Sequence, residues 1–245
     1  MLNTVHYDGP GEVPLLIAHG LFGSARNWGV IAKRLSETRP VIAVDMRNHG
    51  DSPWNDTHSY VDLAADLAAV IDTPCDVLGH SMGGKAAMVL ALQNPEMVRR
   101  LVVADIAPVA YTHTQIGPIE AMRQVDLAGI ASRADAKAQL GELDPGVPDF
   151  LLQSLDMKDR KWRLNLDVLA AEMDKIIGFP VVNGLFDGPT LFLSGGTSDY
   201  VRPEHRPMIK ALFPNAKFAK IPGTGHWLHA EKPREFEAAL SAFLS

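Results

Sequence analysis

The sequence predicts an α/β fold in which a mostly parallel sheet is flanked by helices. Short apolar runs bounded by Gly, Pro and Asp alternate with segments of helical periodicity along the 245 residues. Such alternation implies right-handed crossovers and parallel strands, whose carboxyl ends meet at one edge of the sheet. Ligands of open α/β sheets bind beyond that edge, so we expect the chemistry there.

Composition and charge exclude several kinds of ligand and indicate the cellular compartment. The formal net charge is −6 and no basic stripe is present, which argues against nucleic acid as the main partner. The single cysteine, Cys75, cannot form an internal disulfide, and no Cys/His spacing resembles a zinc site. The first residues resemble no signal peptide, and no run of eighteen apolar residues exists. We therefore expect a cytoplasmic protein that needs no metal and spans no membrane; its oligomeric state stays open.

The expected strands are six short apolar segments with Gly, Pro or Asp at or near their ends. They cover residues 14–18, 41–45, 76–78, 101–104, 190–193 and 218–221. Helical periodicity lies between them, with Leu63, Leu67, Val70 and Ile71 on one face of the first helix. Further helices are expected over 82–93 and 233–244. This order predicts a core of residues 1–105 that resumes at 189–245.

Residues 106–188 interrupt the alternation between two strands that should be neighbours in the sheet. Helices are expected within this insertion over 116–125, 132–140, 148–155 and 166–177. One interpretation is a separate subdomain that packs its apolar stripe on itself. An insertion at the carboxyl edge of a parallel sheet lies over the ligand crevice, however, so we interpret 106–188 as a helical cap.

The nucleophile candidate is Ser81, in the sequence Gly79-His80-Ser81-Met82-Gly83 that follows the apolar run at 76–78. A Gly-x-Ser-x-Gly segment between strand and helix makes a sharp turn with a strained serine, whose hydroxyl projects at the sheet edge. The backbone N–H of Met82 then lies at the helix N-terminus and can stabilise an oxyanion. The alternative is an ordinary glycine-rich helix start.

A second oxyanion donor is expected in the loop after the strand at 14–18. In this architecture that loop supplies one backbone N–H, and Leu21 is the candidate because Gly20 lets the chain turn toward the site. His19 precedes the serine in the chain, which suits a buried hydrogen-bonding residue better than a base. His49 is interpreted in the same way, as a residue that fixes its own loop.

The general base must follow the serine, because the partners of such a nucleophile come in the order Ser, acid, His. Four histidines do so: His113, His205, His226 and His229. His226 follows a strand within a glycine-rich loop, which can present its ring at the carboxyl edge within reach of Ser81. The other three are interpreted as structural or solvent-facing residues.

Several motifs together resemble the alpha/beta-hydrolase superfamily, and in particular the small YbfF-type esterases and the related mitochondrial abhydrolase group. The motifs are HGLFGS at 19–24, DMRNHGDS at 45–52, GHSMGGKAAM at 79–88, DIAPV at 105–109, WRLNLDVL at 162–169 and GTGHWLH at 223–229. The resemblance implies an alpha/beta-hydrolase fold with a helical cap inserted after the sixth strand. It also implies a serine esterase without a cofactor. The segment before the first expected strand is short, so the leading hairpin of the family should be reduced.

Two residues compete for the role of the acid. Most members of this superfamily place it after the later strand, where Asp199 lies, but the usual position in that turn is occupied here by Ser198. Asp105 ends the strand next to the nucleophile's own, within the DIAPV segment. We therefore predict a triad of Ser81, Asp105 and His226, with Ser198 as an additional hydrogen-bonding residue. The alternative role for Asp105 is a loop or helix cap, and Asp199 is interpreted as part of a solvated turn.

These residues predict a serine carboxylesterase that hydrolyses short- to medium-chain acyl esters, or thioesters, through an acyl-serine intermediate. We expect apolar cap residues to line a compact pocket: Met122, Phe150, Leu151, Trp162 and Phe179. Dehalogenation and epoxide opening on this scaffold need a carboxylate nucleophile, so Ser81 excludes them. A carbon–carbon bond hydrolase, a lyase and a non-catalytic binding protein remain alternatives.

Overall fold

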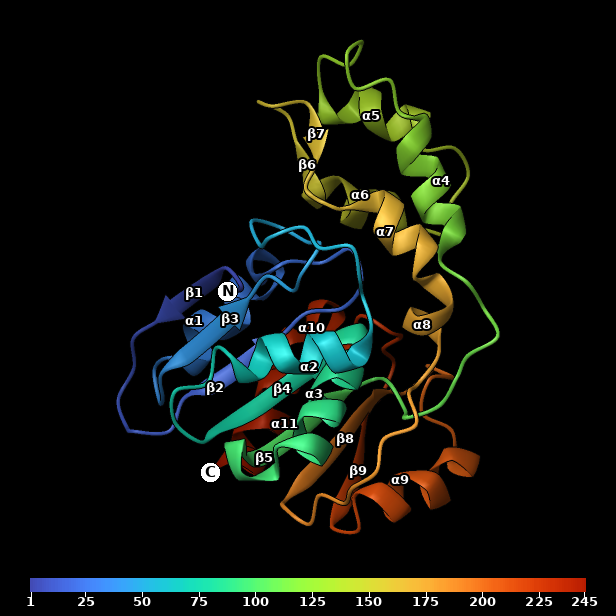
Figure 1. Cartoon of the computed structure of the whole chain (residues 1–245). Helices are drawn as coiled ribbons and strands as arrows, with labels where there is room; N and C mark the ends of the chain where they lie inside the picture. The colour runs from blue at the N-terminus through green and yellow to red at the C-terminus, as the bar shows by residue number, and fades with distance from the viewer.

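A seven-stranded sheet forms the centre of the computed structural model, which describes all residues from 1 to 245 (Figure 1). The strand order is β1-β3-β2-β4-β5-β8-β9; β1 is antiparallel to β3 and every other neighbouring pair is parallel. The mostly parallel sheet predicted from the sequence is therefore confirmed. The strands are β1 (Thr4–Tyr7), β2 (Leu15–Ala18), β3 (Val41–Val44), β4 (Cys75–His80), β5 (Val98–Ala104), β8 (Thr190–Gly195) and β9 (Ala216–Ile221).

The six predicted strands are all present, whereas β1 was not predicted. Its four residues are exposed or half-buried and form no apolar run that the sequence could reveal. The short amino-terminal segment supplies this one strand and no hairpin. Five strands consequently precede the insertion in this chain, so the expectation that it follows the sixth strand is wrong.

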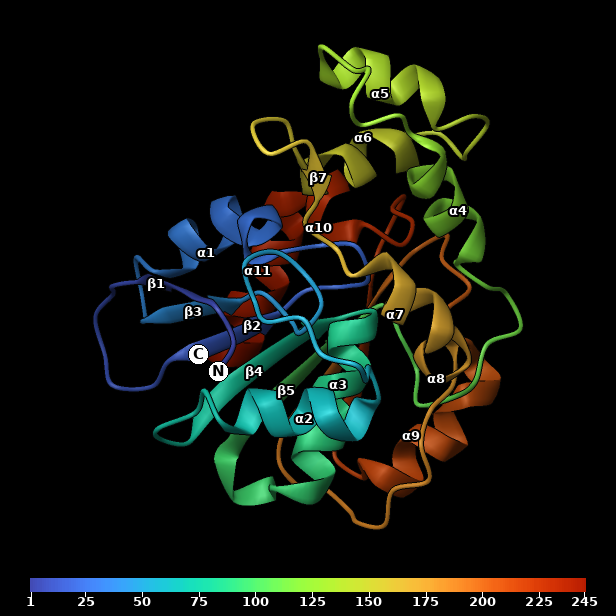
Figure 2. The same ribbon diagram turned by 45° about the horizontal axis from the view of Figure 1, so that its top comes forward.

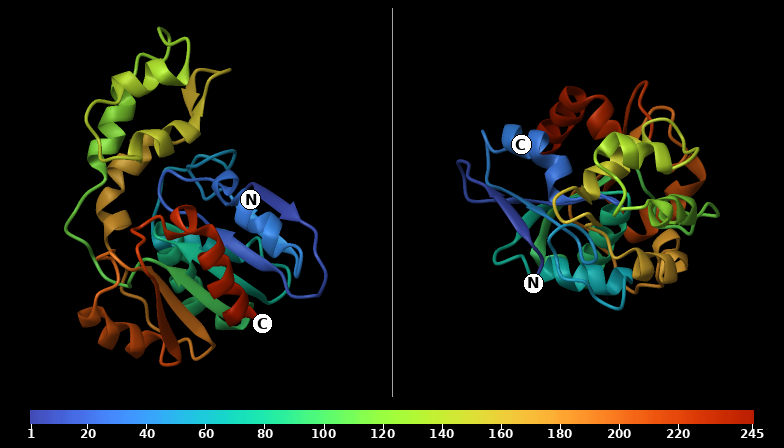
Figure 3. Two further views of the ribbon diagram at one scale, coloured as in Figure 1. Left: turned by 180° about the vertical axis from the view of Figure 1, so that it is seen from behind. Right: turned by 90° about the horizontal axis from the view of Figure 1, so that it is seen from above.

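Helices cover both faces of the sheet (Figure 3). One face packs against α1 (Gly29–Leu35) and α11 (Pro233–Leu244), whose Phe236 and Leu240 are fully buried one helical turn apart. The other face packs against α2 (Tyr60–Ala68), α3 (Met82–Gln93) and α9 (Arg206–Leu212). Both faces of the sheet are thus covered, so a ligand can reach the sheet only at the ends of its strands.

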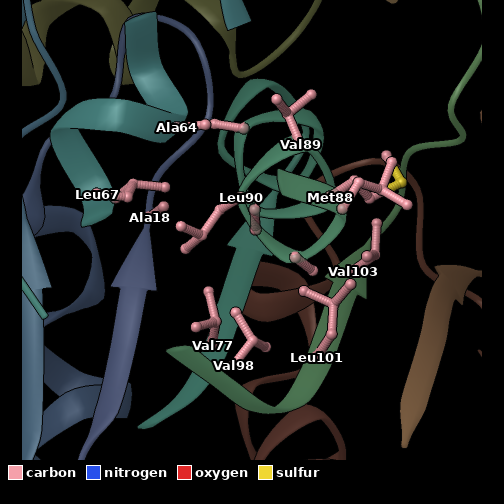
Figure 4. Packing of buried hydrophobic residues seen from close by; sticks show 14 of the residues in the cluster. Ala18, Ala64, Leu67, Val77, Met88, Val89, Leu90, Val98, Leu101 and Val103 are labelled. Atoms are coloured by element: carbon pink, nitrogen blue, oxygen red, sulfur yellow. The ribbon is translucent and has the colours of Figure 1, made fainter. Parts of the chain in front are cut away.

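Helix α3 is buried around almost its whole circumference, between α2 and the sheet. The apolar side chains in this region are shown in Figure 4: Ala18, Ala64, Leu67, Val77, Met88, Val89, Leu90, Val98, Leu101 and Val103. A helix that is apolar on all sides belongs in a protein interior. Its position is therefore fixed by packing, which makes its N-terminus a rigid support for Ser81.

The residues between β5 and β8 form a helical insertion at one end of the molecule (Figures 1 and 2). Seen from above it lies over the core (Figure 3). Its elements are α4 (Ile116–Gln124), α5 (Arg133–Gln139), α6 (Val147–Leu151), η3 (Leu152–Ser154), β6 (Leu155–Asp156), β7 (Lys161–Trp162), α7 (Leu166–Ala171) and α8 (Met173–Ile177). The division of the chain at 105/106 and 188/189 stays a prediction.

One helix was predicted over 166–177, and the structure divides it at Glu172 into α7 and α8. The backbone of Glu172 leaves helical geometry (φ −95°, ψ 8°), although its N–H still donates to Val168 O at 2.9 Å. Its carboxylate accepts a hydrogen bond from the backbone N–H of His58 in the core, at 3.2 Å. The break therefore lies where the insertion contacts the core.

The end of α8 is attached to the core by several hydrogen bonds. Tyr60 Oη donates to Ile176 O at 2.6 Å, and Lys85 Nζ donates to Ile177 O at 2.9 Å and to Gly178 O at 2.5 Å. The N–H of Tyr111, on the outgoing segment, also donates to Ile177 O at 3.0 Å. The outgoing and returning segments of the insertion therefore run side by side.

None of the helices is long and apolar enough to cross a lipid bilayer.

Candidate active site

Ser81 lies in a sharp turn between β4 and α3, with φ 53° and ψ −119°. A non-glycine residue in this region is strained by about 1–3 kcal/mol, which surrounding packing must sustain. A Cβ at Gly79 would collide with the carbonyl of Gly83, and one at Gly83 would collide with the carbonyl of Ala18. The two glycines of the motif are therefore required because strand and helix approach closely. The strained turn predicted for Ser81 is present.

Ser81, His226 and Asp105 form a continuous chain of hydrogen bonds. His226 Nε2 lies 3.0 Å from Ser81 Oγ, and His226 Nδ1 lies 2.7 Å from Asp105 Oδ2. A carboxylate can only accept, so Nδ1 carries the proton and Nε2 is left to accept from the serine hydroxyl. This is the tautomer that a histidine needs in order to deprotonate a serine. The structure thus brings together the three residues selected from the sequence.

Asp105 is fully buried and accepts hydrogen bonds from three residues, one at the end of β8, one in the turn after it and one in the loop after β9. Its Oδ1 accepts from the N–H of Gly195 at 2.9 Å, while Oδ2 accepts from Ser198 Oγ at 2.5 Å and from His226. Ser198 therefore makes the additional hydrogen bond that was predicted for it. The side chain of Asp199 is exposed and makes no hydrogen bond, so it is not placed to orient the imidazole.

Two further residues hold His226, and sequence reasoning missed both. The Tyr200 ring stacks on the imidazole with centroids 4.0 Å apart and planes 21° apart. His80 Nε2 lies 2.8 Å from the backbone carbonyl of His226 and donates to it. Burial, followed by the neighbouring His229 and His226, holds the pKa of His80 well below its ordinary value. His80 directly precedes the serine and Tyr200 follows Ser198 by two positions, but no pattern in the sequence indicates their contacts.

The two predicted oxyanion donors face the same cavity as Ser81. The backbone N–H of Leu21 and that of Met82 donate to no protein acceptor. Met82 begins the twelve-residue α3, so the partial positive charge of the helix N-terminus adds to its N–H dipole. Both groups are therefore free to donate to a ligand oxygen, as an oxyanion hole requires.

The cavity above Ser81 has a volume of about 370 Å³ and lies between core and insertion. Of the five residues predicted to line it, Phe150 and Leu151 do so. Met122 and Trp162 instead pack in the insertion's own apolar cluster, where Trp162 Nε1 donates to Met122 O at 2.9 Å. Phe179 packs against the core cluster. The prediction is wrong for these three because sequence spacing does not show which apolar side chains face a pocket and which pack in an apolar cluster.

The cavity also has a polar wall, in which Lys85 is buried one helical turn beyond Ser81. Its Nζ lies 5.5 Å from the centroid of the Tyr60 ring and 4.8 Å from that of Tyr111. No carboxylate pairs with it, and burial lowers the pKa of Lys85 to about 7. His113 also lines this wall and forms a hydrogen bond of 2.8 Å with Tyr200 Oη. The residue is exposed, in agreement with the solvent-facing role predicted for it.

Two further histidines near the site, His19 and His229, contact other residues of the core. His19 is buried with Nδ1 2.8 Å from Gly20 O, while its Nε2 accepts from the N–H of Met46 at 2.9 Å. His229 stacks on Trp28 with ring centroids 4.3 Å apart. These contacts agree with the structural roles predicted for both. No group of three or more His, Cys, Asp or Glu side chains is arranged to hold a metal ion, and the absence of a cofactor stays a prediction.

Comparisons with known proteins extend over nearly the whole chain. The Alpha/beta hydrolase family matches residues 15–239. The sn-1-specific diacylglycerol lipase ABHD11 of Mus musculus is 43% identical over 255 residues, with 97% of this chain and 83% of that protein covered. Esterase YbfF of Escherichia coli (strain K12) is 38% identical over 241 residues, with 95% and 93% covered.

A solved structure agrees at the level of the fold and of the sequence. The structure described as a marine microorganism esterase has a TM-score of 0.93 and 36% identity, covering 99% of this chain and 98% of that one. The resemblance to YbfF-type and abhydrolase proteins expected from the motifs is thereby confirmed. The chain belongs to the alpha/beta hydrolase family.

Proposed function

We propose that the protein is a serine carboxylesterase that hydrolyses short- to medium-chain acyl esters through an acyl-serine intermediate. The observation that carries the proposal is the Ser81–His226–Asp105 hydrogen-bond chain, which ends at a serine hydroxyl in a cavity of about 370 Å³. The esterase and lipase names of the relatives support ester hydrolysis as the reaction.

The reaction follows from the positions of these groups. His226 Nε2 takes the proton of Ser81 Oγ, which attacks the acyl carbonyl carbon, and the resulting oxyanion accepts from the N–H groups of Leu21 and Met82. The ester C–O bond breaks, and the leaving alcohol takes the proton from His226. Water then repeats the attack on the acyl-serine with His226 as its base, which releases the carboxylic acid and restores the hydroxyl.

A thioester can follow the same path, because a thiol then leaves in place of the alcohol. Carbon–carbon bond hydrolases and lyases could use the same three residues. Chromogenic esters distinguish an esterase from these alternatives, and a fluorophosphonate distinguishes an enzyme with an active serine from a protein that binds ligands without catalysis.

Substitution of Ser81 by Ala tests the proposal directly. The change removes one hydroxyl from a turn whose backbone is held by packing, so the fold should survive. We expect kcat for p-nitrophenyl butyrate to fall by roughly 10⁶-fold, as in other serine enzymes that lose the nucleophile. Fluorophosphonate labelling should disappear as well. A Ser81→Ala protein that still labels fully or turns over ester would overturn the assignment.

Acyl-chain preference is the second test. Phe150 and Leu151 give the cavity an apolar wall. Each added methylene should therefore lower the activation free energy that corresponds to kcat/KM by at most ~0.8 kcal/mol, until the cavity is full. We expect a maximum at short to medium chain lengths in a series of p-nitrophenyl esters from two to sixteen carbons. The size limit is wrong if the sixteen-carbon ester is the best substrate.

A further inference from the structure

Phe22 occupies an unusual place in the loop that carries the oxyanion donor, residues 19–24, which we term the oxyanion loop. Its φ of 64° lies in the left-handed region that a bulky residue rarely adopts. Its side chain is 4% exposed and packs in the apolar cluster of the insertion, together with Leu151, Leu152 and Leu155. A strained residue of the core is thus held by the insertion.

The two backbone groups of Phe22 are bonded to different parts of the molecule. Its N–H donates to Nε2 of the buried His49 in the core, at 3.1 Å. Its carbonyl accepts from the hydroxyl of Ser154 at 2.8 Å. Ser154 ends η3 in the insertion and is 7% exposed, and its own carbonyl accepts from the N–H of Arg163 at 2.8 Å.

The Ser154 hydrogen bond reaches the oxyanion donor through two peptide units. In a planar trans peptide the C=O and the N–H point in opposite directions. The Phe22–Gly23 unit directs its C=O to Ser154 and its N–H to Gly20 O, at 3.0 Å. Gly20 O belongs to the Gly20–Leu21 unit, so fixing that oxygen directs the opposite group, the N–H of Leu21, away from it.

We propose that Ser154 of the insertion is a positioning residue that aims the Leu21 N–H at the developing oxyanion. The proposal rests on the esterase function proposed above and adds a residue that touches neither substrate nor triad. It makes the oxyanion hole a joint product of core and insertion. Two histidines of the core hold the same loop from the other side. His19 Nδ1 lies 2.8 Å from Gly20 O, and His49 Nε2 accepts from the N–H of Phe22.

A purely structural role for Ser154 would have different consequences. Loss of its hydroxyl leaves the buried carbonyl of Phe22 without a donor, which lowers stability in either case. A misaimed oxyanion donor lowers kcat in addition, because that donor binds the tetrahedral oxygen more strongly than the substrate carbonyl. The kcat of the folded enzyme, with KM measured in parallel, therefore separates the two roles.

The experiment compares Ser154→Ala with Ser132→Ala, another serine of the insertion. Ser132 caps α5, where its hydroxyl accepts from the N–H of Asp135 at 3.2 Å, and it is exposed. With active sites titrated by fluorophosphonate end point, Ser154→Ala should lose about tenfold in kcat for p-nitrophenyl butyrate, with KM within about twofold. That loss lies below the 10²–10³ cost of removing an oxyanion donor outright. Ser132→Ala should keep the wild-type kcat.

A second pair of variants keeps the result decisive if Ser154→Ala folds poorly. Thr and Val have nearly the same shape and differ in the hydroxyl, so Ser154→Thr should retain more kcat per titrated site than Ser154→Val. A trifluoromethyl ketone, whose adduct carries the oxyanion, should bind Ser154→Val more weakly than Ser154→Thr. Equal kcat and equal inhibition in the pair, or an unchanged kcat in Ser154→Ala, would overturn the proposal.

Failure of this inference is distinguishable from failure of the proposed function. If the wild-type protein hydrolyses esters in a Ser81-dependent manner but Ser154 variants keep full kcat, the positioning role is wrong and the esterase stands. If the wild-type protein neither hydrolyses chromogenic esters nor labels with fluorophosphonate, the proposed function itself is wrong.

Discussion

The hydrogen bonds of Asp105 show how one residue can fix the geometry of this site. Its two oxygens accept from Gly195, Ser198 and His226, so the carboxylate is fixed in position before any ligand binds. Such preorganisation matters because a histidine can deprotonate a serine only in one tautomer and one orientation. The acid is therefore the residue whose replacement tests the geometry most sharply.

Asp105→Asn keeps the shape of the side chain but favours the wrong His226 tautomer. We expect kcat to fall on the order of 10⁴-fold. Asp199→Asn is the matched control, because Asp199 is exposed and makes no side-chain hydrogen bond. It should stay within about tenfold of wild type, a barrier change of at most ~1.4 kcal/mol. Steady-state kinetics on a chromogenic ester decide the ranking, and the reverse order would move the acid to Asp199.

The sequence was informative for residues that belong to local motifs. Ser81 and His226, which the structure places within hydrogen-bonding distance, were selected from a turn and a glycine-rich loop, because the proposed chemistry requires those surroundings within a few residues. Tyr200 and Ser154 could not be found in this way. Their roles depend on contacts with residues 26 and 132 positions away, His226 and Phe22, and no local pattern encodes such a contact.

At the level of elements, the attachment of α8 to α2 and α3 couples the insertion to the helix that carries the nucleophile. Lys85 lies one turn after Ser81 and donates to two carbonyls at the end of α8. Carbonyls at a helix C-terminus carry partial negative charge, which suits an ammonium group. Burial without a carboxylate partner nevertheless lowers the pKa of Lys85 to about 7. This contact should therefore depend on pH.

Lys85→Met tests that dependence. Between pH 7 and the ordinary lysine pKa of about 10.4, the unfolded chain holds the Lys85 proton and the native state does not, so the free energy of unfolding rises with pH. Urea titrations at pH 7.0 and 8.5 should show a rise of up to ~1.4 kcal/mol per pH unit in wild type that Lys85→Met lacks. Lys137→Met, at an exposed lysine of the insertion, should retain it. Equal slopes in all three proteins would rule out the burial effect.

Most elements were predictable, because buried strands and amphipathic helices have local periodicity. Helices α3 and α11 have the predicted bounds. The exceptions are instructive: β1 has no apolar run, and the predicted helix over 166–177 is divided where Glu172 contacts His58 in the core. In both cases the determining contacts come from distant parts of the chain.

Across the whole molecule, burial keeps an unusual number of histidines neutral. Burial lowers the pKa of six histidines, of which His113 is exposed and the other five lie largely inside the protein: His19, His49, His58, His80 and His229. The pKa falls to about 3 for His58 and His229. The histidine count is visible in the sequence, but their burial is not, because it results from contacts between residues that lie far apart in the chain. The native state thus resists protonation that the unfolded chain accepts.

This difference predicts marked acid lability. Below the ordinary histidine pKa of about 6.5 the unfolded chain binds protons that the native state excludes, so the free energy of unfolding falls as pH falls. Each such histidine contributes up to ~1.4 kcal/mol per pH unit. Urea titrations from pH 7.5 to 4.5 should show this decline. His58→Gln should flatten it and His6→Gln, at an exposed position, should not; a constant free energy from pH 6.5 to 5 would contradict the prediction.

The insertion begins and ends on neighbouring strands, since Leu101 of β5 pairs with Thr190 of β8. A segment with adjacent ends can be lengthened or exchanged without altering strand order, because loop closure depends only weakly on length. The core should therefore accept other caps between β5 and β8, and such replacements should change the range of substrates. The Ser154 contact sets a condition for such transplants: a grafted cap that brings a new pocket must also bring a donor for the carbonyl of Phe22.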